Sequence, residues 1–435
     1  MGSVHGAVGG HVDGTGGGAG VGAGRRAAVD VVGAGIVGAA VAWRAARAGY
    51  RVRLFDPLLA GGAPQTGASW AAGGMLAPFS EGRPGEDRVL ALGAASLRRW
   101  PGFARRLREE TGVDVITARG TLMVGADGAD ADGIRTVGTW LTERGGSGGP
   151  SDGAPVPSAP ARSDPVPSAP APGDAAVPVP EPLSRAQVRE RHRGLARNLR
   201  GGLWLGTELA VDNRTLLSAL RTAAVRAGAV PVPARWSPAD SADADHAVVT
   251  AGTDVASLLP GVPVRPVKGE ILRLRRPDAV PPPPGCTVRA SVHGRQVYLV
   301  PRPDGLVVGA TMYEHGQDRT VTVGGVRDLI ADAQTVLPSI AEYTLADAMA
   351  GLRPMTPDNL PVIGATGAEH TRRGRRGGPR VVAATGHGRN GVLLTPVTVD
   401  AVLGELGGAP IAEAGGLGPE RFGAGTPVHG VHGCA

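Results

Sequence analysis

The sequence predicts an α/β fold made of two interleaved domains, on the basis of three observations. A glycine-rich turn joins a short apolar strand to an apolar helix near the N-terminus, and strand-like segments follow one another between residues 266 and 349. An apolar strand and helix then return near the C-terminus. Alternating strands and helices indicate a parallel sheet, whereas consecutive strands joined by short turns indicate an antiparallel one. We therefore expect a parallel-sheet domain built from discontinuous segments and a second, α+β domain containing an antiparallel sheet.

The N-terminal unit has the pattern strand, helix, strand. Residues 29–33 are typical of a short buried strand, residues 36–48 repeat apolar side chains at helical spacing, and residues 51–56 alternate like a strand. The segment GAGIVG lies between the first strand and the helix, where a GxGxxG pattern marks a dinucleotide-binding turn. The unit therefore predicts a Rossmann-like nucleotide-binding domain.

Each glycine of this turn has a predicted task. Gly33 permits the tight turn, Gly35 lets a pyrophosphate approach the backbone, and Gly38 allows the helix to pack closely on the strand. Asp56 ends the second strand 18 residues after Gly38, close to the spacing of about 20 expected for an acid that binds the ribose. The predicted nucleotide contacts of this unit are Gly33, Gly35, Ile36, Val37, Gly38 and Asp56.

The same periodicities predict the later elements. The predicted helices are residues 87–111 (bent or broken near Pro101), 213–227, 326–337 and 392–406. The predicted strands are residues 247–251, 267–274, 297–301, 306–310 and 381–384, with turns at His293-Gly294 and Pro303-Asp304-Gly305.

Three segments have compositions that cannot form a core, and they set the expected domain limits. Residues 1–26 and 409–435 are glycine-rich, and residues 145–182 are proline-rich and contain PVPSAPA twice, so we expect two flexible tails and a disordered surface insertion. The nucleotide-binding domain is expected at 27–112, 207–265 and 350–408. The second domain is expected at 113–144, 183–206 and 266–349.

Composition limits the class of protein. Two cysteines cannot form a disulfide framework, and with no metal-binding pattern we expect no metal site and a cytoplasmic location. The basic excess is almost entirely arginine, scattered among acids, and aromatic residues are only 3% of the chain, which argues against nucleic-acid binding. No apolar stretch is long enough to cross a membrane. We expect a homo-oligomer.

Three further segments favour FAD over NAD as the nucleotide. Small residues at 67–78 offer backbone to a flavin, and residues 247–254 resemble a strand end that touches the cofactor. The glycine-rich segment 384–396 leads into a helix whose N-terminus favours negative charge on a reduced ring. Each segment alone is equally well read as a packed turn, but their combination favours a flavin.

Two arginines near the C-terminus lie among small or apolar residues. Arg353 lies in AGLRPMTPDNLPVIG and Arg389 in ATGHGRNGVLLTP. A guanidinium in such a setting suits a planar anion such as a carboxylate. For Arg353 the alternative is a structural salt bridge with Asp347 or Asp358.

At these residues the chain resembles the D-amino-acid-oxidase-like family of FAD enzymes, and within it the glycine oxidases of thiamine biosynthesis. The matching segments are VVGAGIVGAAVAW, GASWAAGGMLAP, PVKGEILRL, YLVPRPDGLVVGATM, AGLRPMTPDNLPVIG and GHGRNGVLLTP. The resemblance implies noncovalent FAD and oxidation of glycine, or of a similar small amine, to the imine by hydride transfer to flavin N5. Oxygen would reoxidise the flavin and yield hydrogen peroxide, and the imine would supply the thiazole ring of thiamine.

The resemblance also implies roles for individual residues. Arg353 would bind the substrate carboxylate, Tyr298 would place a hydroxyl at the substrate, and Arg389 would lie at the edge of the flavin and substrate pocket. The further cofactor contacts expected are Ser69, Ala71, Gly73, Gly74, Met75, Gly252, Gly386, His387, Arg389, Asn390 and Gly391.

Some interpretations remain open at this point. His387 is either a base or, more in keeping with a loop before a helix, a structural histidine, and Tyr298 is either a site residue or a sheet aromatic. Lys268, the only lysine, receives no role. Gly388 departs from the larger residue of the family and would loosen the pocket, which leaves other D-amino acids or sarcosine as substrates. A flavin-binding protein without turnover is the alternative of a different class.

Overall fold

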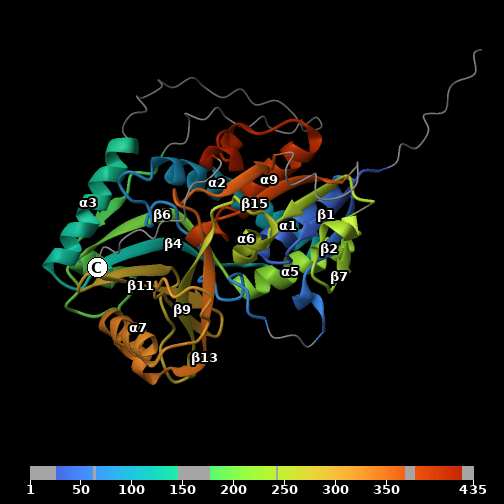
Figure 1. The fold of residues 1–435 in the computed structure, drawn as a ribbon. Helices are drawn as coiled ribbons and strands as arrows, with labels where there is room; N and C mark the ends of the chain where they lie inside the picture. Colours follow the sequence, from blue (N-terminus) through green and yellow to red (C-terminus); the bar gives the residue numbers. More distant parts are fainter. Residues whose placement is uncertain (1–25, 62–64, 146–176, 242, 368–377, 424–435) are drawn as a thin grey trace, which may run out of the picture.

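The computed structural model describes residues 26–61, 65–145, 177–241, 243–367 and 378–423 (Figure 1). Within them the chain forms two sheets, one of six strands and one of nine. Two sheets with helices packed on them are what the sequence predicts. Residues 1–25 of the expected tail and most of the proline-rich insertion lie outside the described residues.

The first sheet carries the nucleotide-binding turn. Its strands lie in the order β14-β15-β8-β1-β2-β7, and every neighbouring pair is parallel except β14 with β15. The strands are β1 (Ala28–Val32), β2 (Arg51–Phe55), β7 (Val230–Val232), β8 (His246–Val249), β14 (Val362–Ala365) and β15 (Arg380–Thr385). Strands from both ends of the chain therefore share one sheet, as predicted.

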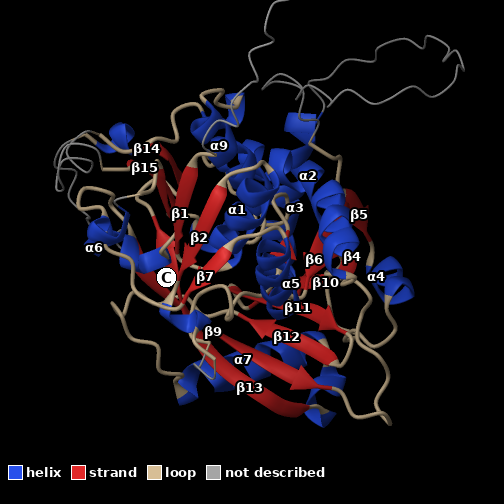
Figure 2. Cartoon of the chain, turned by 90° about the vertical axis from the view of Figure 1, so that its right-hand side faces the viewer, coloured by secondary structure: helices blue, strands red, loops and turns tan. Residues whose placement is uncertain are grey.

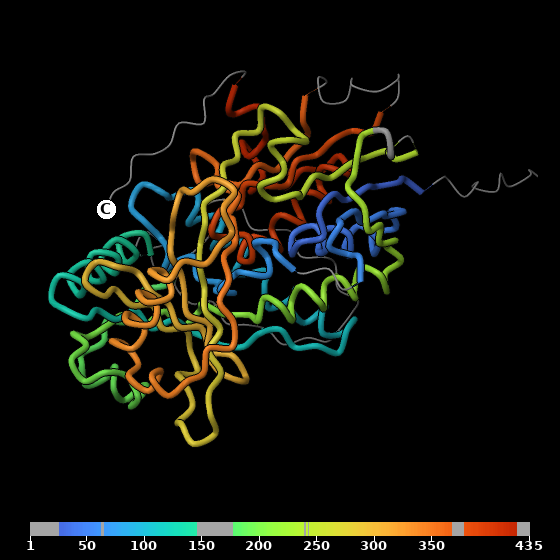
Figure 3. The backbone as a smooth tube through the Cα atoms, turned by 60° about the horizontal axis from the view of Figure 1, so that its bottom comes forward, coloured from blue at the N-terminus to red at the C-terminus, as the bar shows by residue number. Residues whose placement is uncertain are grey.

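Helices cover one face of this sheet (Figure 2). They are α1 (Ile36–Arg47), α2 (Asp87–Thr111), α5 (Asn213–Arg226) and α9 (Thr395–Gly407). Trp43 of α1 packs edge-on against Phe103 of α2, and Trp100 Nε1 donates a hydrogen bond of 2.8 Å to the Leu393 carbonyl. These buried side chains join the N-terminal and C-terminal parts of the domain, which lie in the same half of the molecule (Figure 3).

The second sheet has the order β13-β9-β12-β11-β10-β4-β6-β3, with β5 paired to β6. Its strands are β3 (Met75–Leu76), β4 (Ile116–Gly125), β5 (Glu181–Leu183), β6 (Gly202–Val211), β9 (Arg265–Arg275), β10 (Thr287–Val292), β11 (Arg295–Arg302), β12 (Gly305–Gly309) and β13 (Thr344–Met355). Helix α7 (Val323–Val336) packs on one face (Figure 2). The opposite face carries the small apolar cluster that contains Ile271, Val300 and Val307, with Tyr298 beside it.

The predicted elements are confirmed with ends shifted by a few residues. The turn at His293-Gly294 has positive φ at both residues (50° and 80°), as expected for a tight hairpin. Helix α2 is continuous across Pro101, so the predicted break there is wrong, and Pro101 lies on the exposed face of the helix. The sequence analysis missed several elements: β4, β6, β13, β14, α3 (Gly128–Gly145) and α4 (Arg185–Arg191).

Two segments predicted to be disordered or flexible carry structure. Glu181 and Pro182, at the end of the proposed insertion, belong to β5 and pair with β6. Residues 409–423, expected to be a flexible tail, contain two short 3₁₀ helices and bury Leu417 and Phe422. The Leu417 carbonyl accepts a hydrogen bond of 2.9 Å from Ile363. These apolar side chains and backbone pairings outweigh the glycine-rich composition that prompted both predictions.

The expected domain limits stay predictions, with two points of detail. Strand β6 runs across the expected limit at 206/207, and β13 runs across the limit at 349/350. Both strands belong to the second sheet and end beside the first domain. In the described part of the chain, no helix is both long and apolar enough to span a bilayer.

The third glycine of the nucleotide-binding turn generates a stability prediction. A Cβ at Gly38 would lie 1.8 Å from the Gly33 carbonyl oxygen, so Gly38→Ala forces α1 away from β1. We expect a loss of about 1–3 kcal/mol in the free energy of unfolding, measured by urea denaturation. Gly407→Ala, at an open helical position, is the control and should be neutral or slightly stabilising. Equal effects of both changes would contradict the packing role of Gly38.

Candidate active site

One cavity of about 660 Å³ collects most of the predicted site residues. It begins at the start of α1, passes along the loop before β3, and ends among β10, β11, β13 and the loop before α9. The predicted residues that line it are Gly35, Ile36, Val37, Ser69, Ala71, Gly73, Gly74, Met75, Gly252, Tyr298, Arg353, His387, Arg389 and Gly391. The predicted residues outside this lining are Gly33, Gly38, Asp56, Gly386 and Asn390.

The start of α1 forms the nucleotide end of the cavity. Its N-cap is Gly35, which has no side chain to cap it, and its first turn contains no acid. Ser69 Oγ accepts the Ile36 N–H at 2.9 Å, and the positive helix end still faces the cavity, where it favours an anion. Gly33 adopts a φ of 100°, as its predicted turn requires. Asp56 lies next to this turn, where its carboxylate accepts hydrogen bonds of 2.8 Å from the backbone of Ala34 and of Leu58.

The loop at 67–78 is fixed from both domains. Asn213, at the start of α5, donates hydrogen bonds of 2.9 Å to the carbonyls of Ser69 and Trp70. Arg302, at the end of β11, donates one of 2.8 Å to the Gly73 carbonyl. Backbone atoms of this loop are thereby held along the cavity wall, where small side chains leave room for a planar ring.

Arg353 lies on β13 and reaches across the neighbouring strand. Its guanidinium lies over Gly269, where a Cβ would come within 2.3 Å of two of its nitrogens. It donates hydrogen bonds to the carbonyls of Lys268 (3.3 Å) and Thr311 (3.2 Å). Among the described residues, no carboxylate oxygen lies within 4.0 Å of it. Burial lowers its pKa.

The two acids considered as structural partners of Arg353 are engaged elsewhere. Asp347 pairs with Arg214 at 2.6 Å, and Asp358 pairs with Arg421 at 2.9 Å. The salt-bridge interpretation of Arg353 is therefore wrong. What remains is a partly buried cation that lines the cavity and has no carboxylate partner among the described residues.

Tyr298 lies on β11 with its ring on the cavity side of the second sheet. Gly73 and Gly309 make room for it, because a Cβ at either position would lie less than 3 Å from its hydroxyl. Burial raises the pKa of Tyr298 to about 12; of the nearby charges, Arg353 lowers it and Glu81 raises it. The hydroxyl therefore stays protonated at neutral pH and can donate a hydrogen bond into the cavity.

The loop before α9 contributes Arg389 and His387. Arg389 lines the cavity and pairs with Glu86 at 2.8 Å, so its charge is matched, unlike that of Arg353. His387 is buried, and its Nε2 lies 2.9 Å from Oγ1 of Thr398 on α9. Burial lowers the pKa of His387 to about 4. A neutral imidazole that contacts α9 fits the interpretation of His387 as a structural histidine better than the interpretation as a catalytic base.

Gly388 occupies a position that a side chain could enter only with strain. Its φ is 55°, and a Cβ would lie 2.7 Å from the sulfur of Met355. Met355 thus fills part of the space that the larger residue of the family would take. The predicted loosening of the pocket at Gly388 is reduced by this contact.

Lys268 lies outside the cavity lining. Its buried ammonium is 2.6 Å from Asp318 and 3.3 Å from Glu270, the latter fully buried. Although burial lowers the pKa of Lys268, the hydrogen bonds that it donates to its two acidic partners outweigh this effect and raise the pKa. The only lysine of the chain is therefore the cation of an ion cluster on β9, which it forms with Asp318 and Glu270.

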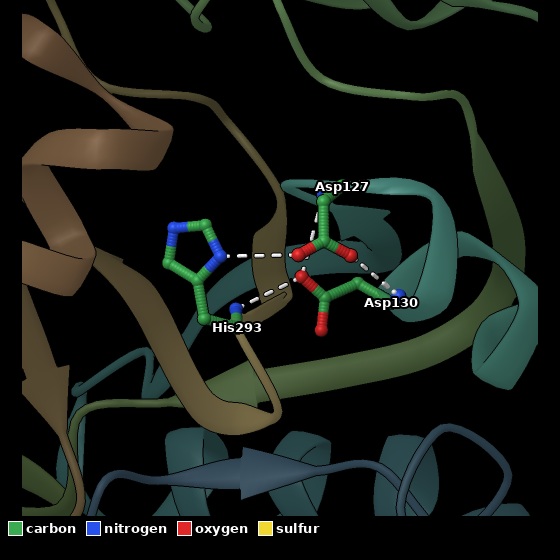
Figure 4. Close-up of side chains that lie close together, drawn as sticks. All are labelled: Asp127, Asp130 and His293. Atoms are coloured by element: carbon green, nitrogen blue, oxygen red, sulfur yellow. Dashed lines mark hydrogen bonds and ion pairs between the residues drawn. The ribbon is translucent and has the colours of Figure 1, made fainter.

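Asp127, Asp130 and His293 form a group of potential metal ligands at the far end of the cavity (Figure 4). The oxygens of Asp130 already accept bonds from Ser291 Oγ and from the backbone of Asp127, His293 and Gly294. These bonds outweigh the effect of burial and lower the pKa of Asp130. The group fastens the β10–β11 hairpin to the start of α3.

Sequence reasoning missed three charged residues of the site. Glu81 and Arg289 line the cavity, and the fully buried Glu208 accepts hydrogen bonds of 2.8 Å from the backbone of Phe79 and Ser80. Glu81 follows the recognised segment 67–78 by only three residues, which was the available signal. Arg289 stands directly opposite Tyr298 in the β10–β11 ladder, a relation that only strand register reveals.

The residues present suit FAD. The start of α1, which carries no acid, fits a pyrophosphate, the small residues of the 67–78 loop leave a flat wall, and the cavity continues past them to Tyr298 and Arg353. Such a cavity would hold an extended dinucleotide with its ring against the second domain.

The low pKa of His387 predicts a pH dependence of stability. Above pH 6.5 its imidazole is neutral in both states and contributes nothing; below it, only the unfolded chain takes up the proton until about pH 4. We expect this group to remove about 3 kcal/mol of unfolding free energy between pH 6.5 and 4. His387→Gln should flatten the profile relative to wild type, whereas the exposed His315→Gln should leave it unchanged. A profile of His387→Gln parallel to that of wild type would disprove the assignment.

Comparison with known proteins agrees with this geometry. The sequence profile described as FAD dependent oxidoreductase (DAO) matches residues 29–402. The glycine oxidase of Geobacillus kaustophilus is 30% identical in sequence, over 85% of this chain and 90% of the relative. A crystal structure of glycine oxidase from that organism superposes with a TM-score of 0.71 at 27% identity, and the match covers 90% of this chain and 98% of the other.

A bifunctional protein ThiO/ThiG of Synechocystis sp. is 30% identical over 90% of this chain. The chain spans about half the length of that relative (53%) and of a second one from Trichormus variabilis (51%), and 34% of a third from Nostoc sp.. Because the family profile covers both sheets and the whole cavity, the chain belongs to the DAO family of FAD-dependent oxidoreductases.

Proposed function

We propose that this protein oxidises glycine, or a similar small amine, to the imine, and that oxygen is the final electron acceptor. The observation that carries the proposal is Arg353: a partly buried guanidinium without a carboxylate partner among the described residues, facing the same cavity as the flavin-side loop. A cation in that state is stabilised by a ligand carboxylate, which can form two charge-assisted hydrogen bonds with it. The names glycine oxidase and thiamine biosynthesis oxidoreductase ThiO among the relatives support the same substrate and a role in thiamine biosynthesis.

FAD, when bound, would supply the two-electron acceptor of the reaction, through hydride transfer to N5 and reoxidation by oxygen to hydrogen peroxide. The protein's part is to bind and orient the substrate. Arg353 would hold the carboxylate, and the protonated Tyr298 hydroxyl would donate a hydrogen bond to the same ligand. Holding the substrate at a fixed place beside the ring makes the transfer effectively intramolecular.

The cofactor is proposed to be noncovalent. Cys286 is not among the cavity-lining residues, and burial raises its pKa to about 11, which disfavours the thiolate that a covalent link would need. Cys434 lies outside the described residues.

Other small substrates remain a second candidate because of Gly388 and Met355. Met355 is a flexible side chain, so it can yield to a methyl group on the substrate and admit sarcosine or a small D-amino acid. Anaerobic reduction of the flavin by glycine, sarcosine and D-alanine, followed by peroxide measurement in air, tests both candidates. A protein that binds FAD and is reduced by none of them is a flavin-binding protein without turnover.

Removal of the Arg353 charge tests the carboxylate assignment. We expect Arg353→Ala to weaken the apparent affinity for glycine by about 1.5–3 kcal/mol, the value of a charge-assisted hydrogen bond. The measurement is the glycine dependence of anaerobic flavin reduction. Arg119→Ala, an exposed arginine on β4 outside the cavity, is the control. Unchanged glycine affinity in Arg353→Ala would refute the proposal.

Gly269 offers a subtler test, since it touches no substrate in this scheme. The three atoms nearest to a Cβ there all belong to the flexible end of Arg353, so Gly269→Ala should displace the guanidinium at little cost in stability. We expect at least tenfold weaker glycine affinity, about 1.4 kcal/mol, with a melting temperature close to that of wild type. Retained affinity, or a large loss of stability, would show that Gly269 does not serve to place Arg353.

A further inference from the structure

Glu81 is a carboxylate on the cavity wall that has no committed partner. Its side chain is 17% exposed, and its oxygens lie 3.9 Å from Nε of Arg389 and 4.0 Å from a terminal nitrogen of Arg289. Both distances are longer than the donor–acceptor distance of a hydrogen bond. No hydrogen bond to its carboxylate is formed by any of the described residues. Glu81 can therefore accept hydrogen bonds from a ligand without giving one up.

The backbone that carries Glu81 is fixed from three elements. Glu208 of β6 accepts the backbone hydrogens of Phe79 and Ser80, and Arg289 of β10 donates to the Ser80 carbonyl. Arg389 donates a bond of 3.3 Å to the carbonyl of Glu81 itself. Three anchors around one turn indicate that the position of this carboxylate is built into the site.

The charges around Glu81 belong to the proposed substrate site. Arg389 and Arg289 are its nearest cations, and Arg83 on its own loop, Arg353 on β13 and Tyr298 on β11 are close enough to interact with it electrostatically. Glu81 thus lies on the same side of the cavity as the carboxylate anchor, in a region where cations outnumber acids.

The other acids in the cavity lining are already engaged. Asp130 accepts four hydrogen bonds, and Asp127 accepts the backbone hydrogen of Asp130 and pairs with His293. A zwitterionic amino acid presents a carboxylate and an ammonium group a short distance apart. Among the described cavity residues, Arg353 offers the cation for the first, and Glu81 is the acid left for the second.

We propose that Glu81 binds the amino group of the substrate, so that the ligand is held at both ends, its carboxylate on Arg353 and its amine on Glu81. This inference rests on the proposed function, because it assumes an amino-acid substrate. A substrate fixed at two points cannot rotate about the Arg353 contact, which directs its α-carbon toward one place on the cavity wall. It also gives the site a means to prefer amino acids over hydroxy acids.

The test compares glycine with glycolate, which has a hydroxyl in place of the ammonium. Glu81→Gln should weaken the apparent affinity for glycine, measured by anaerobic flavin reduction, by at least tenfold, because a charge-assisted bond to the ammonium is lost. The inhibition constant of glycolate against glycine should change less than about twofold. Glu86→Gln is the matched control, since Glu86 also pairs with Arg389 but offers no carboxylate to the amine in this scheme.

The outcomes separate the alternatives. A loss for glycine alone, in Glu81→Gln alone, supports amine binding. Equal losses for glycine and glycolate, no loss, or the same loss in Glu86→Gln would overturn it, because the effect would then act through Arg389 or through the fold. A wild-type protein that no amine reduces would refute the proposed function itself, which is a different result from a wild type reduced by glycine and unaffected by Glu81→Gln.

Discussion

The buried contact between Asp212 and Arg302 is the interaction on which the site depends. Asp212 caps α5 of the first domain by accepting hydrogen bonds of 2.9 Å from Arg214 and Thr215, and it lies 2.9 Å from Nε of Arg302. Arg302 belongs to the second sheet and also holds the Gly73 carbonyl. Burial lowers the pKa of Arg302 to about 10, but the group remains charged at neutral pH. Loss of Asp212 would leave Arg302 buried without a carboxylate partner among the described residues, a cost of about 3–5 kcal/mol, whereas Asp212 would still have Arg273 at 3.2 Å if Arg302 were lost.

This one contact joins helix, sheet and loop, and it explains why the cavity has a defined shape. The loop at 67–78 has few side chains large enough to pack, so its position comes from polar anchors on both sides. Glycines then leave the space that Arg353 and Tyr298 occupy: Gly269 under the guanidinium, and Gly73 and Gly309 around the phenol. The position of these two site residues therefore requires glycine, which has no side chain, at the neighbouring positions.

The charges of the site fall into matched and unmatched groups. Arg389 has Glu86, while Lys268 has Asp318 and Glu270, and these pairs hold the structure. Among the described residues, Arg353 faces the cavity without a carboxylate partner, and Glu81 lies 3.9 and 4.0 Å from two arginines without a hydrogen bond to its carboxylate. A cation and an acid that both keep hydrogen-bonding capacity toward one cavity are what a zwitterionic ligand would complete, which links the proposed substrate to the proposed role of Glu81.

The sequence by itself determined the features that depend on neighbouring residues. The turn from Gly33 to Gly38 and the alternation of strands and helices are local patterns, so both were predictable. The choice of Arg353 as a candidate anion-binding residue was predictable as well, because small or apolar residues surround it in the sequence. It failed where composition was the only guide: the glycine-rich segment at 409–423 is held by Leu417 and Phe422, whose burial partners lie elsewhere in the chain. Only the tertiary structure decided that Asp347 and Asp358 belong to other arginines, and that Glu81, Arg289 and Arg353 share one cavity. These residues come from segments up to 272 positions apart, and their electrostatic relation exists only after the two sheets have packed together.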